Sequence, residues 1–215
     1  LMRATTHGAQ MDAIYRRQRH IYDLTRKYYL LGRDHMIRHL QVPAGGHVLE
    51  LGCGTGRNLL RANRHYPDAH FHGLDISCEM LDTARRSTER AQLDIGFAVG
   101  DASSFDAALL FPQVRFDRIF ISYALSMIPA WQATITHALS LLDHGGSLHI
   151  VDFGQQERLP AWFKAGLFAW LEQFQVHPRQ ELFDHLRSQG TLHSTEIMIE
   201  PLFRGYAWHT IVNTT

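Results

Sequence analysis

A glycine-rich segment and an aspartate 19 residues beyond it are the first candidates for chemistry in this sequence. The segment reads Glu50-Leu51-Gly52-Cys53-Gly54-Thr55-Gly56, between an apolar run and a helix-like stretch. Glycine lets the backbone turn tightly and approach a ligand, and the N–H groups that open a helix bind anions or carboxylates. Asp75 ends the next apolar run, where a parallel α/β sheet places a carboxylate against ribose hydroxyls. The pattern predicts a nucleotide-like ligand, with Cys53 as a small filler of the loop and not a nucleophile.

The elements that must position these residues are short apolar runs that alternate with helix-like stretches. The runs are typical of buried strands and cover residues 48–51, 71–76, 95–100, 119–122 and 148–153. The helix-like stretches cover residues 57–65, 77–90 and 131–142, with Ser77 as a candidate N-cap. Alternation of this kind predicts an α/β fold with a single doubly wound, mostly parallel sheet and helices on both faces.

The C-terminal part of the chain departs from this alternation. Ala161–Phe174 is an aromatic, weakly charged helical pattern, and Arg179–Gln189 is a second helical pattern. His193–Glu200 and Gly205–Val212 alternate in polarity, which predicts an antiparallel hairpin that closes one edge of the sheet. The aromatic helix is too short to span a bilayer. It would cover a lipid cleft, form a dimer seam, lie in a membrane interface or be buried under the hairpin.

Composition limits the classes of partner. The chain has 215 residues and a mass of 24.7 kDa, which favours a single domain. Lys+Arg and Asp+Glu both number 21, so a nucleic-acid partner, which calls for a strongly basic domain, is not expected. The first 40 residues nevertheless hold eight basic and three acidic side chains, which indicates a local anionic partner such as a membrane surface, or a solvated helix face. Two cysteines are too few for a disulfide framework and indicate a reducing compartment.

The 15 histidines do not form a metal-binding pattern along the sequence. His65, His70 and His72 are the densest group, but no carboxylate stands beside them at the spacing that a metal site needs. No metal is therefore expected.

The order of residues in the glycine segment distinguishes between two kinds of cofactor. A dinucleotide fingerprint would need glycine at position 57, which is arginine. The sequence instead reads E-x-G-x-G-x-G and resembles the first motif of class I S-adenosylmethionine (SAM) methyltransferases. Gly73–Ser77 with Met80 is similar to the second motif of that family, Gly100–Ala102 to the third, and Leu142–Phe153 to the end of its core.

That resemblance implies SAM as the cofactor, S-adenosylhomocysteine as its product, and the strand order 3-2-1-4-5-7-6 with an antiparallel C-terminal hairpin strand. Asp75 would take both ribose hydroxyls, and Ile76 and Met80 would flank the adenine. Asp101 and Ala102 would meet the adenine edge. The methionine moiety would lie against the loop residues Glu50, Gly52, Cys53, Gly54 and Gly56.

Met11–Asp34 carries two sets of side chains at seven-residue spacing. Tyr15, Tyr22 and Tyr29 form one set, and the other set is Arg19, Arg26 and Arg33. On one continuous helix each set would make a stripe. Tyrosine rings attract cations through their π faces, so the tyrosines would line a site for an amine that becomes quaternary. In the alternative interpretation they pack the helix on the sheet and the arginines face water.

Residues 21–34 (IYDLTRKYYLLGRD) and 121–129 (ISYALSMIP) resemble the bacterial betaine-lipid N-methyltransferases. That resemblance implies trimethylation of the lipid amine diacylglycerylhomoserine by a cytoplasmic protein that is peripheral at the inner face of the membrane. It divides the chain into an N-terminal helical extension, residues 1–41, and a SAM-binding methyltransferase domain, residues 42–215. The alternatives are a quinone, phosphatidylethanolamine or another small amine as acceptor, and a non-catalytic SAM-binding regulatory subunit.

The acceptor amine must be held in line with the methyl group that it receives. Tyr123 and Ser126 follow the fourth strand, at the edge where open α/β sheets bind ligands. Tyr123 is the first choice for orienting the amine, with a core packing role as the alternative, and Tyr22 and Tyr29 complete the predicted catalytic group. Substrate binding is assigned to Tyr15, Tyr28, Arg33 and Ser126.

Overall fold

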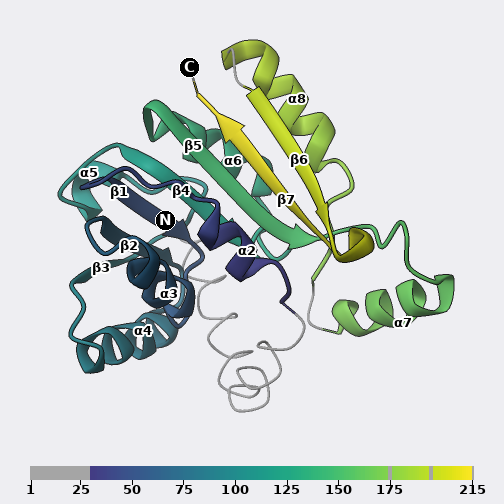
Figure 1. Cartoon of the computed structure of the whole chain (residues 1–215), viewed down its shortest axis with the longest axis horizontal. Helices are drawn as coiled ribbons and strands as arrows, with labels where there is room; N and C mark the ends of the chain where they lie inside the picture. The colour runs from purple at the N-terminus through teal and green to yellow at the C-terminus, as the bar shows by residue number, and fades with distance from the viewer. Residues whose placement is uncertain (1–29, 174–175, 194–195, 215) are drawn as a thin grey trace.

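The computed structural model describes residues 30–173, 176–193 and 196–214. These residues form one seven-stranded sheet in the order β3-β2-β1-β4-β5-β7-β6, which is the predicted order (Figure 1). Strands β1 to β5 are parallel to one another, whereas β7 is antiparallel to both β5 and β6. The strands are β1 (His47–Leu51), β2 (His70–Asp75), β3 (Ile95–Val99), β4 (Phe116–Ser122), β5 (Leu142–Phe153), β6 (Glu196–Leu202) and β7 (Ala207–Asn213).

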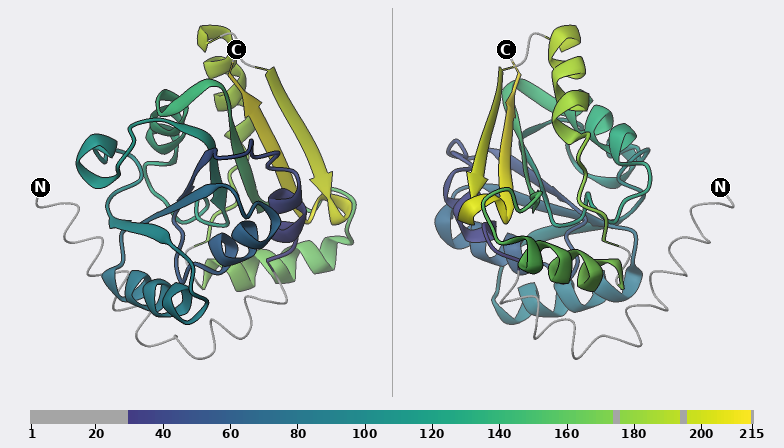
Figure 2. Two further views of the ribbon diagram at one scale, coloured as in Figure 1. Left: turned by 60° about the vertical axis from the view of Figure 1, so that its left-hand side comes forward. Right: turned by 90° about the vertical axis from the view of Figure 1, so that its right-hand side faces the viewer.

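Helices cover both faces of the sheet, as predicted for a doubly wound fold (Figure 2). Because side chains alternate along a strand, Leu49 and Ile119 join the core on one face, and Val48 and Phe120 join the core on the other. The first face carries α5 (Ala107–Leu110), α6 (Trp131–Ser140) and α8 (Leu182–His193). The second face carries α2 (Arg33–Arg38), α3 (Arg57–His65) and α4 (Cys78–Arg90), and α7 (Ala161–Glu172) lies beyond its edge (Figure 1).

The predicted continuous helix over Met11–Asp34 is wrong at its C-terminal end. Residues 30–32 are not helical, and α2 begins after Gly32, whose φ is +86°. A left-handed residue interrupts a right-handed helix, so a helix from residue 11 cannot continue through Asp34. Residues 11–29, with Tyr15, Tyr22, Tyr28 and Tyr29, lie outside the described residues.

Other boundaries also differ from the prediction, among them the ends of two helices. Helix α6 ends at Ser140 and not at Leu142, because Leu142 already pairs with Phe116 in the sheet. Helix α8 continues beyond Gln189 to His193, through a glycine that costs a helix about 1 kcal/mol and does not end it here. Strand pairing, and not local residue preference, therefore decides where α6 ends.

The described part of the predicted N-terminal extension packs into the core of the domain. Met36, Ile37 and Leu40 are fully buried on the face that also carries α3. The Arg118 guanidinium donates to the backbone carbonyls of Leu40 and Gln41, each at 2.7 Å. Residues 30–41 are therefore tied to strand β4, and the boundary at residue 41 stays a prediction.

Replacing Gly32 by alanine should destabilise the domain by more than the same change at Gly45. Both glycines have positive φ, +86° and +71°, so each alanine should cost about 1–2 kcal/mol of backbone strain. The added Cβ at Gly32 would lie 2.9 Å from Leu202 Cδ1 and 3.1 Å from Val151 Cγ2, whereas at Gly45 no described atom lies within 4 Å. Urea unfolding of both variants measures the difference. Equal losses of unfolding free energy would show that the start of α2 does not pack as described.

Candidate functional site

The loop between β1 and α3 has the tight backbone that its glycines predict. Gly52 and Gly56 have φ values of +72° and +75°, and Gly56 is the N-cap of α3. A Cβ at Gly52 would lie 2.6 Å from the Cβ of Ala124, so only glycine fits against the segment that follows β4. The backbone N–H groups of Gly52 and Cys53 both donate to the Leu74 carbonyl, at 2.8 and 3.0 Å. The loop is therefore fastened to the end of β2.

Two buried polar side chains brace the base of this loop. Glu50 is 1% exposed, and its Oε1 accepts a hydrogen bond from Asn58 Nδ2 at 2.7 Å. Burial of a carboxylate is costly unless it is hydrogen-bonded, so Asn58, in the first turn of α3, supports the acid at the end of β1. Asn58 was not among the predicted site residues. Its signal in the sequence is weak, since asparagine near a helix start is usually a cap or a surface residue.

Asp75 contacts the loop directly. It is the last residue of β2, as predicted, and its Oδ2 accepts the N–H of Gly54 at 2.7 Å while Oδ1 accepts the N–H of Ser77 at 2.9 Å. A carboxylate has about four lone-pair positions, so these two bonds do not exhaust its capacity. The assignment of Asp75 to ribose hydroxyls stays a prediction that the geometry allows.

The end of β3 lies beside Asp75. The N–H of Gly100 donates to the Asp75 carbonyl at 3.0 Å, and Asp101 follows with its Oδ1 accepting from both the backbone and the hydroxyl of Ser103, at 2.9 and 2.7 Å. Ala102 is buried behind this turn. The residues predicted to hold the adenine are therefore grouped at one edge of the sheet, where Ile76 is half-buried and Met80 is buried.

A cavity of about 240 Å³ opens beside the glycine loop. It brings together four parts of the chain: the loop with the end of β1, the start of α3, the end of β4, and the described start of the N-terminal segment. The lining residues are Leu30, Arg33, Glu50, Gly52, Cys53, Gly54, Thr55, Arg57, Asn58 and Ser122. Arg33, which was predicted to bind the acceptor, is thus placed against the cofactor loop.

Cys53 lines this cavity without the properties of a nucleophile. Burial raises the pKa of its thiol well above the ordinary value, and the nearby carboxylates of Asp75 and Glu50 act in the same direction. The thiol therefore stays protonated at neutral pH, whereas the thiolate is the reactive form. This agrees with its predicted role as a filler of the loop.

Tyr123 directly follows β4 and is buried. Its hydroxyl donates to the Leu31 carbonyl, and its ring meets the ring of Phe153 edge to face at 4.7 Å. Burial, with smaller contributions from Asp152 and Tyr206, raises the pKa of the phenol well above its usual value. Tyr123 thus anchors the segment before α2, which matches the packing alternative, and its predicted contact with the amine stays a prediction.

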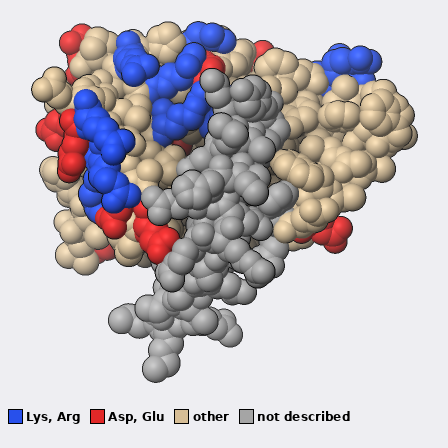
Figure 3. Space-filling model, turned by 90° about the horizontal axis from the view of Figure 1, so that it is seen from below, with Lys and Arg blue, Asp and Glu red and all other residues tan. Residues whose placement is uncertain are grey.

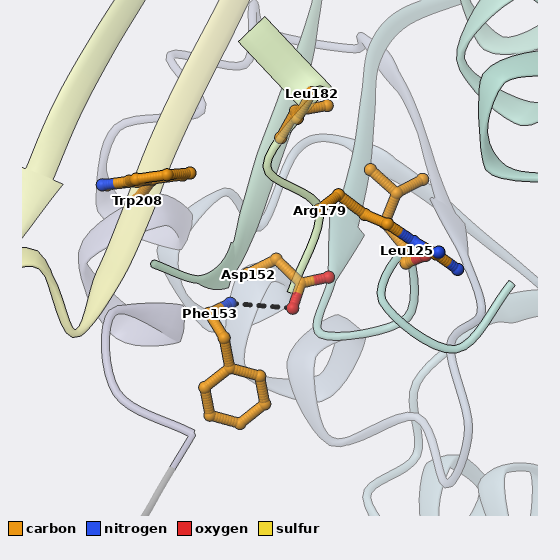
Figure 4. Close-up of a pocket in the computed structure, with 6 residues that line it drawn as sticks. All are labelled: Leu125, Asp152, Phe153, Arg179, Leu182 and Trp208. Atoms are coloured by element: carbon orange, nitrogen blue, oxygen red, sulfur yellow. Dashed lines mark hydrogen bonds between the residues drawn. The ribbon is translucent and has the colours of Figure 1, made fainter. Parts of the chain in front are cut away.

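Asp152, near the end of β5, was not among the predicted site residues but belongs to this edge of the sheet. It is buried, and it accepts the N–H groups of Ser126 at 2.9 Å and Phe153 at 2.8 Å (Figure 4). Burial raises the pKa of its carboxyl to about 6, although these two hydrogen bonds and Arg179 act in the opposite direction. The Arg179 guanidinium in turn donates to the Ile128 carbonyl at 2.9 Å.

The Asp152 carboxylate therefore shapes the segment 124–128, which carries the predicted substrate residue Ser126. The small cavity beside it has a volume of about 10 Å³ and is lined by Leu125, Asp152, Phe153, Arg179, Leu182 and Trp208 (Figure 4). That volume is close to the minimum for a single water molecule, so the acceptor itself does not bind there.

This sheet order, with a glycine loop after β1 and a carboxylate at the end of β2, defines the class of SAM-dependent methyltransferases with an α/β fold. The comparison with known families agrees. The chain belongs to the methyltransferase domain family, whose profile matches residues 43–197.

Named relatives share this domain at moderate identity. The chain is 28% identical over 138 residues to a demethylmenaquinone methyltransferase of Listeria monocytogenes, which covers 63% of this chain and 56% of the relative. It is 28% identical over 133 residues to a malonyl-[acyl-carrier protein] O-methyltransferase of Ilyobacter polytropus, covering 60% and 47%. The chain spans about half the length of the curated relatives that it matches.

Solved structures confirm the fold. The plantazolicin methyltransferase BpumL, in a complex with a desmethyl analogue and S-adenosylhomocysteine, superposes with a TM-score of 0.72 at 14% identity, covering 99% of this chain and 95% of that one. A SAM-dependent methyltransferase from Aquifex aeolicus gives a TM-score of 0.66 at 15% identity, covering 89% and 93%. The predicted class and cofactor are confirmed, whereas none of these proteins is named for a betaine lipid.

Removing the Asp75 carboxylate should weaken SAM binding at least about tenfold. Each hydrogen bond to a charged group contributes about 1.5–3 kcal/mol, and Asp75→Ala also releases the N–H of Gly54 that orders the loop. Calorimetric titration with SAM measures the change. Asp82→Ala is the matched control, since Asp82 is an exposed carboxylate on α4 that pairs with Arg85 of the same helix. Unchanged affinity in a folded Asp75→Ala protein would contradict the assignment.

The raised pKa of Asp152 predicts a pH-dependent contribution to stability. Because the folded-state value is about 6 against 3.8 for an ordinary aspartate, its stabilising contribution is fully present below about pH 3.8 and is lost as pH rises through about 6. Asp152→Asn removes this titration. The unfolding free energy of the wild type relative to that variant should therefore rise by on the order of 3 kcal/mol between about pH 7 and about pH 4.

Denaturant unfolding at a series of pH values measures this difference. Asp143→Asn removes an exposed carboxylate from the same strand and controls for net charge. A wild-type to Asp152→Asn difference that does not change with pH would show that the Asp152 carboxyl titrates normally.

Proposed function

We propose that this domain binds SAM beside its glycine loop and transfers methyl groups to the amine of a lipid head group, with diacylglycerylhomoserine as the first candidate. The observation that supports the lipid part is helix α7, an aromatic and largely uncharged helix at the edge of the domain that exposes Trp162. The resemblance of residues 21–34 and 121–129 to betaine-lipid N-methyltransferases supports the choice of amine.

The donor set of the cavity fits the amino-acid end of SAM. Arg33 and Glu50, a buried cation and a buried anion, both line it, together with the backbone of the glycine loop. In this proposal Arg33 pairs with the carboxylate and the loop with Glu50 receives the ammonium group, since charge-assisted hydrogen bonds are the strong ones. Asp75 receives the ribose hydroxyls. Bound SAM would supply an electrophilic methyl group on its sulfonium centre.

One alternative from the sequence was that the aromatic helix is buried under the hairpin, and helix α7 does not match it. Trp162 is 76% exposed, and of the α7 residues only Leu171 is buried. Lys164 and Glu172 are its charged residues, and the right-hand part of the surface in Figure 3, on the side that carries α7 in Figure 1, is largely uncharged. Its other aromatic residues, Phe163, Phe168 and Trp170, are half-buried against the core. A short helix with an exposed indole and few charges suits the interfacial region of a bilayer, which supports a peripheral membrane location.

A row of aromatic rings connects α7 with the end of β4. Tyr123 packs on Phe153 at 4.7 Å, Phe153 on Tyr206 at 5.9 Å, and Tyr206 on Phe163 at 6.4 Å. Trp162 lies next, 6.0 Å from Phe163. The proposed membrane contact and the ligand-binding edge of the sheet are thus joined by packed side chains, so a lipid held at α7 would present its head group near that edge.

The residues of this chain would promote methyl transfer mainly by holding the two reactants in place. Methyl transfer to an amine needs the neutral nitrogen held in line with the methyl group, and aromatic rings stabilise the cation that forms. We propose that tyrosine rings line the acceptor site. Tyr15 and Tyr28 are assigned to substrate binding, and Tyr22 and Tyr29 to the catalytic group. Tyr123 would not accept the amine proton at neutral pH, because its pKa is raised and its hydroxyl is bonded to Leu31.

A quinone is the second candidate acceptor. The Listeria monocytogenes relative is named a demethylmenaquinone methyltransferase, and an apolar, membrane-embedded quinone would use the exposed face of α7 equally well. The further alternatives are phosphatidylethanolamine or another small amine as acceptor, and a non-catalytic SAM-binding subunit.

In the described part of the chain, no helix is both long and apolar enough to cross a bilayer.

The test is turnover with the acceptor presented in vesicles. The protein is incubated with SAM carrying a labelled methyl group and with vesicles that contain diacylglycerylhomoserine, phosphatidylethanolamine or demethylmenaquinone. Mass spectrometry should show mono-, di- and trimethylated diacylglycerylhomoserine. Methylation of the quinone alone would replace the lipid amine as substrate, and SAM binding without any product would favour the regulatory alternative.

Trp162→Ala should reduce vesicle binding and turnover of a vesicle-embedded acceptor without changing SAM affinity. Burying the indole in the bilayer interface removes apolar surface from water, which contributes about 1.5–3 kcal/mol for a large side chain, so binding should weaken about tenfold or more. Vesicle co-sedimentation measures it. Leu109→Ala is the control, because Leu109 is 82% exposed on α5, on the opposite face of the sheet. Equal vesicle binding by both variants would remove α7 from the membrane contact.

A further inference from the structure

Three side chains from distant parts of the sequence meet on the α2 side of the C-terminal hairpin. His35 from α2, Glu200 from β6 and His209 from β7 place one potential ligand atom each within 4.8 Å of the others. The Nε2 of His35 lies 2.8 Å from Glu200 Oε2, and the Nδ1 of His209 lies 3.9 Å from the same oxygen. Glu200 and His209 are directly opposite each other in the β6–β7 pair. The hairpin therefore supplies two ligand atoms and α2 the third.

The surroundings of His209 are the main argument for a cation at this group. It is 1% exposed, and its Nδ1 has no hydrogen-bond partner among the described residues. Its Nε2 lies 3.3 Å from His149 Nδ1, and His149 Nε2 lies 2.9 Å from the Ser147 hydroxyl. If His209 donates through Nε2 along this row, its Nδ1 presents a lone pair toward the Glu200 carboxylate. A buried lone pair that faces a carboxylate is a poor arrangement unless a cation lies between them.

We propose that His35 Nε2, Glu200 Oε2 and His209 Nδ1 bind a divalent transition-metal ion, with Zn²⁺ as the best match. Zn²⁺ takes imidazole nitrogens and carboxylate oxygens at about 2.0–2.2 Å in tetrahedral geometry, which puts ligand atoms about 3.3 Å apart. The two separations to Glu200 Oε2 lie on either side of that value, and the two imidazole nitrogens lie within 4.8 Å of each other, so the side chains would draw together around the ion. One or more waters would complete the coordination.

The surroundings match those of metal-bound histidines. A histidine ligand usually donates its second ring nitrogen to a neighbouring acceptor, which fixes the tautomer, and His149 is placed to accept from His209. The densest histidine group along the sequence, His65, His70 and His72, is not part of this site.

The ion would join the two ends of the described chain. His35 and Glu200 are separated by 165 positions in the sequence, and His35 stands two residues after Arg33, which lines the cofactor cavity. A bound ion would hold α2 on the β6–β7 hairpin and thereby fix the position of Arg33. This site is independent of the acceptor that the enzyme uses.

The test is metal binding by the full chain, first stripped with a chelator. Co²⁺ is the probe, since tetrahedral Co²⁺ absorbs in the visible range, and Zn²⁺ retained after dialysis is counted by elemental analysis. The wild type should bind one ion per chain, and Zn²⁺ should raise its thermal unfolding temperature. His35→Gln and Glu200→Gln should each weaken binding at least about tenfold, because even outer contacts of a metal site contribute that much.

His65→Ala is the matched control, since His65 is an exposed histidine on α3 outside the cluster. It should leave both the stoichiometry and the thermal shift unchanged. His209→Gln is avoided because this buried side chain is part of the core packing around β7. No saturable Co²⁺ binding by the wild type would overturn the proposal. Equal binding by the wild type, His35→Gln and Glu200→Gln would overturn it as well, because the ions would then sit elsewhere on a histidine-rich chain.

Discussion

The hydrogen bond from the Gly54 N–H to the Asp75 carboxylate is the contact on which the ligand-binding edge depends. It joins the loop after β1 to the end of β2, and the N–H groups of Gly52 and Cys53 bind the next carbonyl back along β2. A chain of glycines has high conformational freedom, and ordering it costs more entropy than ordering any other residue. These three bonds offset that cost and hold the loop in the shape that leaves a cavity beside it. The candidate cofactor site is thus a property of two strand ends together.

The second organising feature is the way that the start of the described chain packs onto the sheet. The Tyr123 hydroxyl binds the Leu31 carbonyl, Arg118 binds the carbonyls of Leu40 and Gln41, and the apolar side of α2 is buried. These contacts place Arg33 beside the cavity at the glycine loop, and they place His35 beside Glu200. One short segment therefore takes part both in the proposed SAM site and in the proposed metal site, because opposite sides of its six-residue helix face different parts of the domain.

In the proposed function, helix α7 directs a common fold to a particular class of acceptor. The parallel core resembles that of enzymes with different acceptors, such as those named for menaquinone and acyl-carrier-protein substrates. Function on such a fold is decided by the segments that surround the site. We propose that the exposed indole of Trp162 and the row of rings behind it are such a segment in this chain.

The sequence by itself predicted the glycine loop with its two acids from local signals: short apolar runs, glycines at a strand end, and a carboxylate one strand further on. The sheet order and the cofactor class were implied by the resemblance of its motifs to those of class I SAM methyltransferases. The sequence also predicted the hairpin, because the alternation of polarity has a period of two. The helix over residues 11–34 failed at its end, because Gly32 takes a left-handed conformation in contact with Val151 and Leu202, which no local pattern announces.

Only the tertiary structure decided where Arg33, Asp152 and the histidines lie. Arg33 was assigned to the acceptor by its seven-residue spacing, and packing of α2 placed it against the cofactor loop. The buried environment of Asp152 arises from segments 125–126 and 179–182, far from it in the sequence. The group of His35, Glu200 and His209 depends on an antiparallel register and a docked helix, so linear spacing carries no sign of it. These contacts join residues that are distant in the sequence, up to 165 positions for His35 and Glu200. The fold creates them, and local sequence rules, which extend over a few turns or strands, do not contain them.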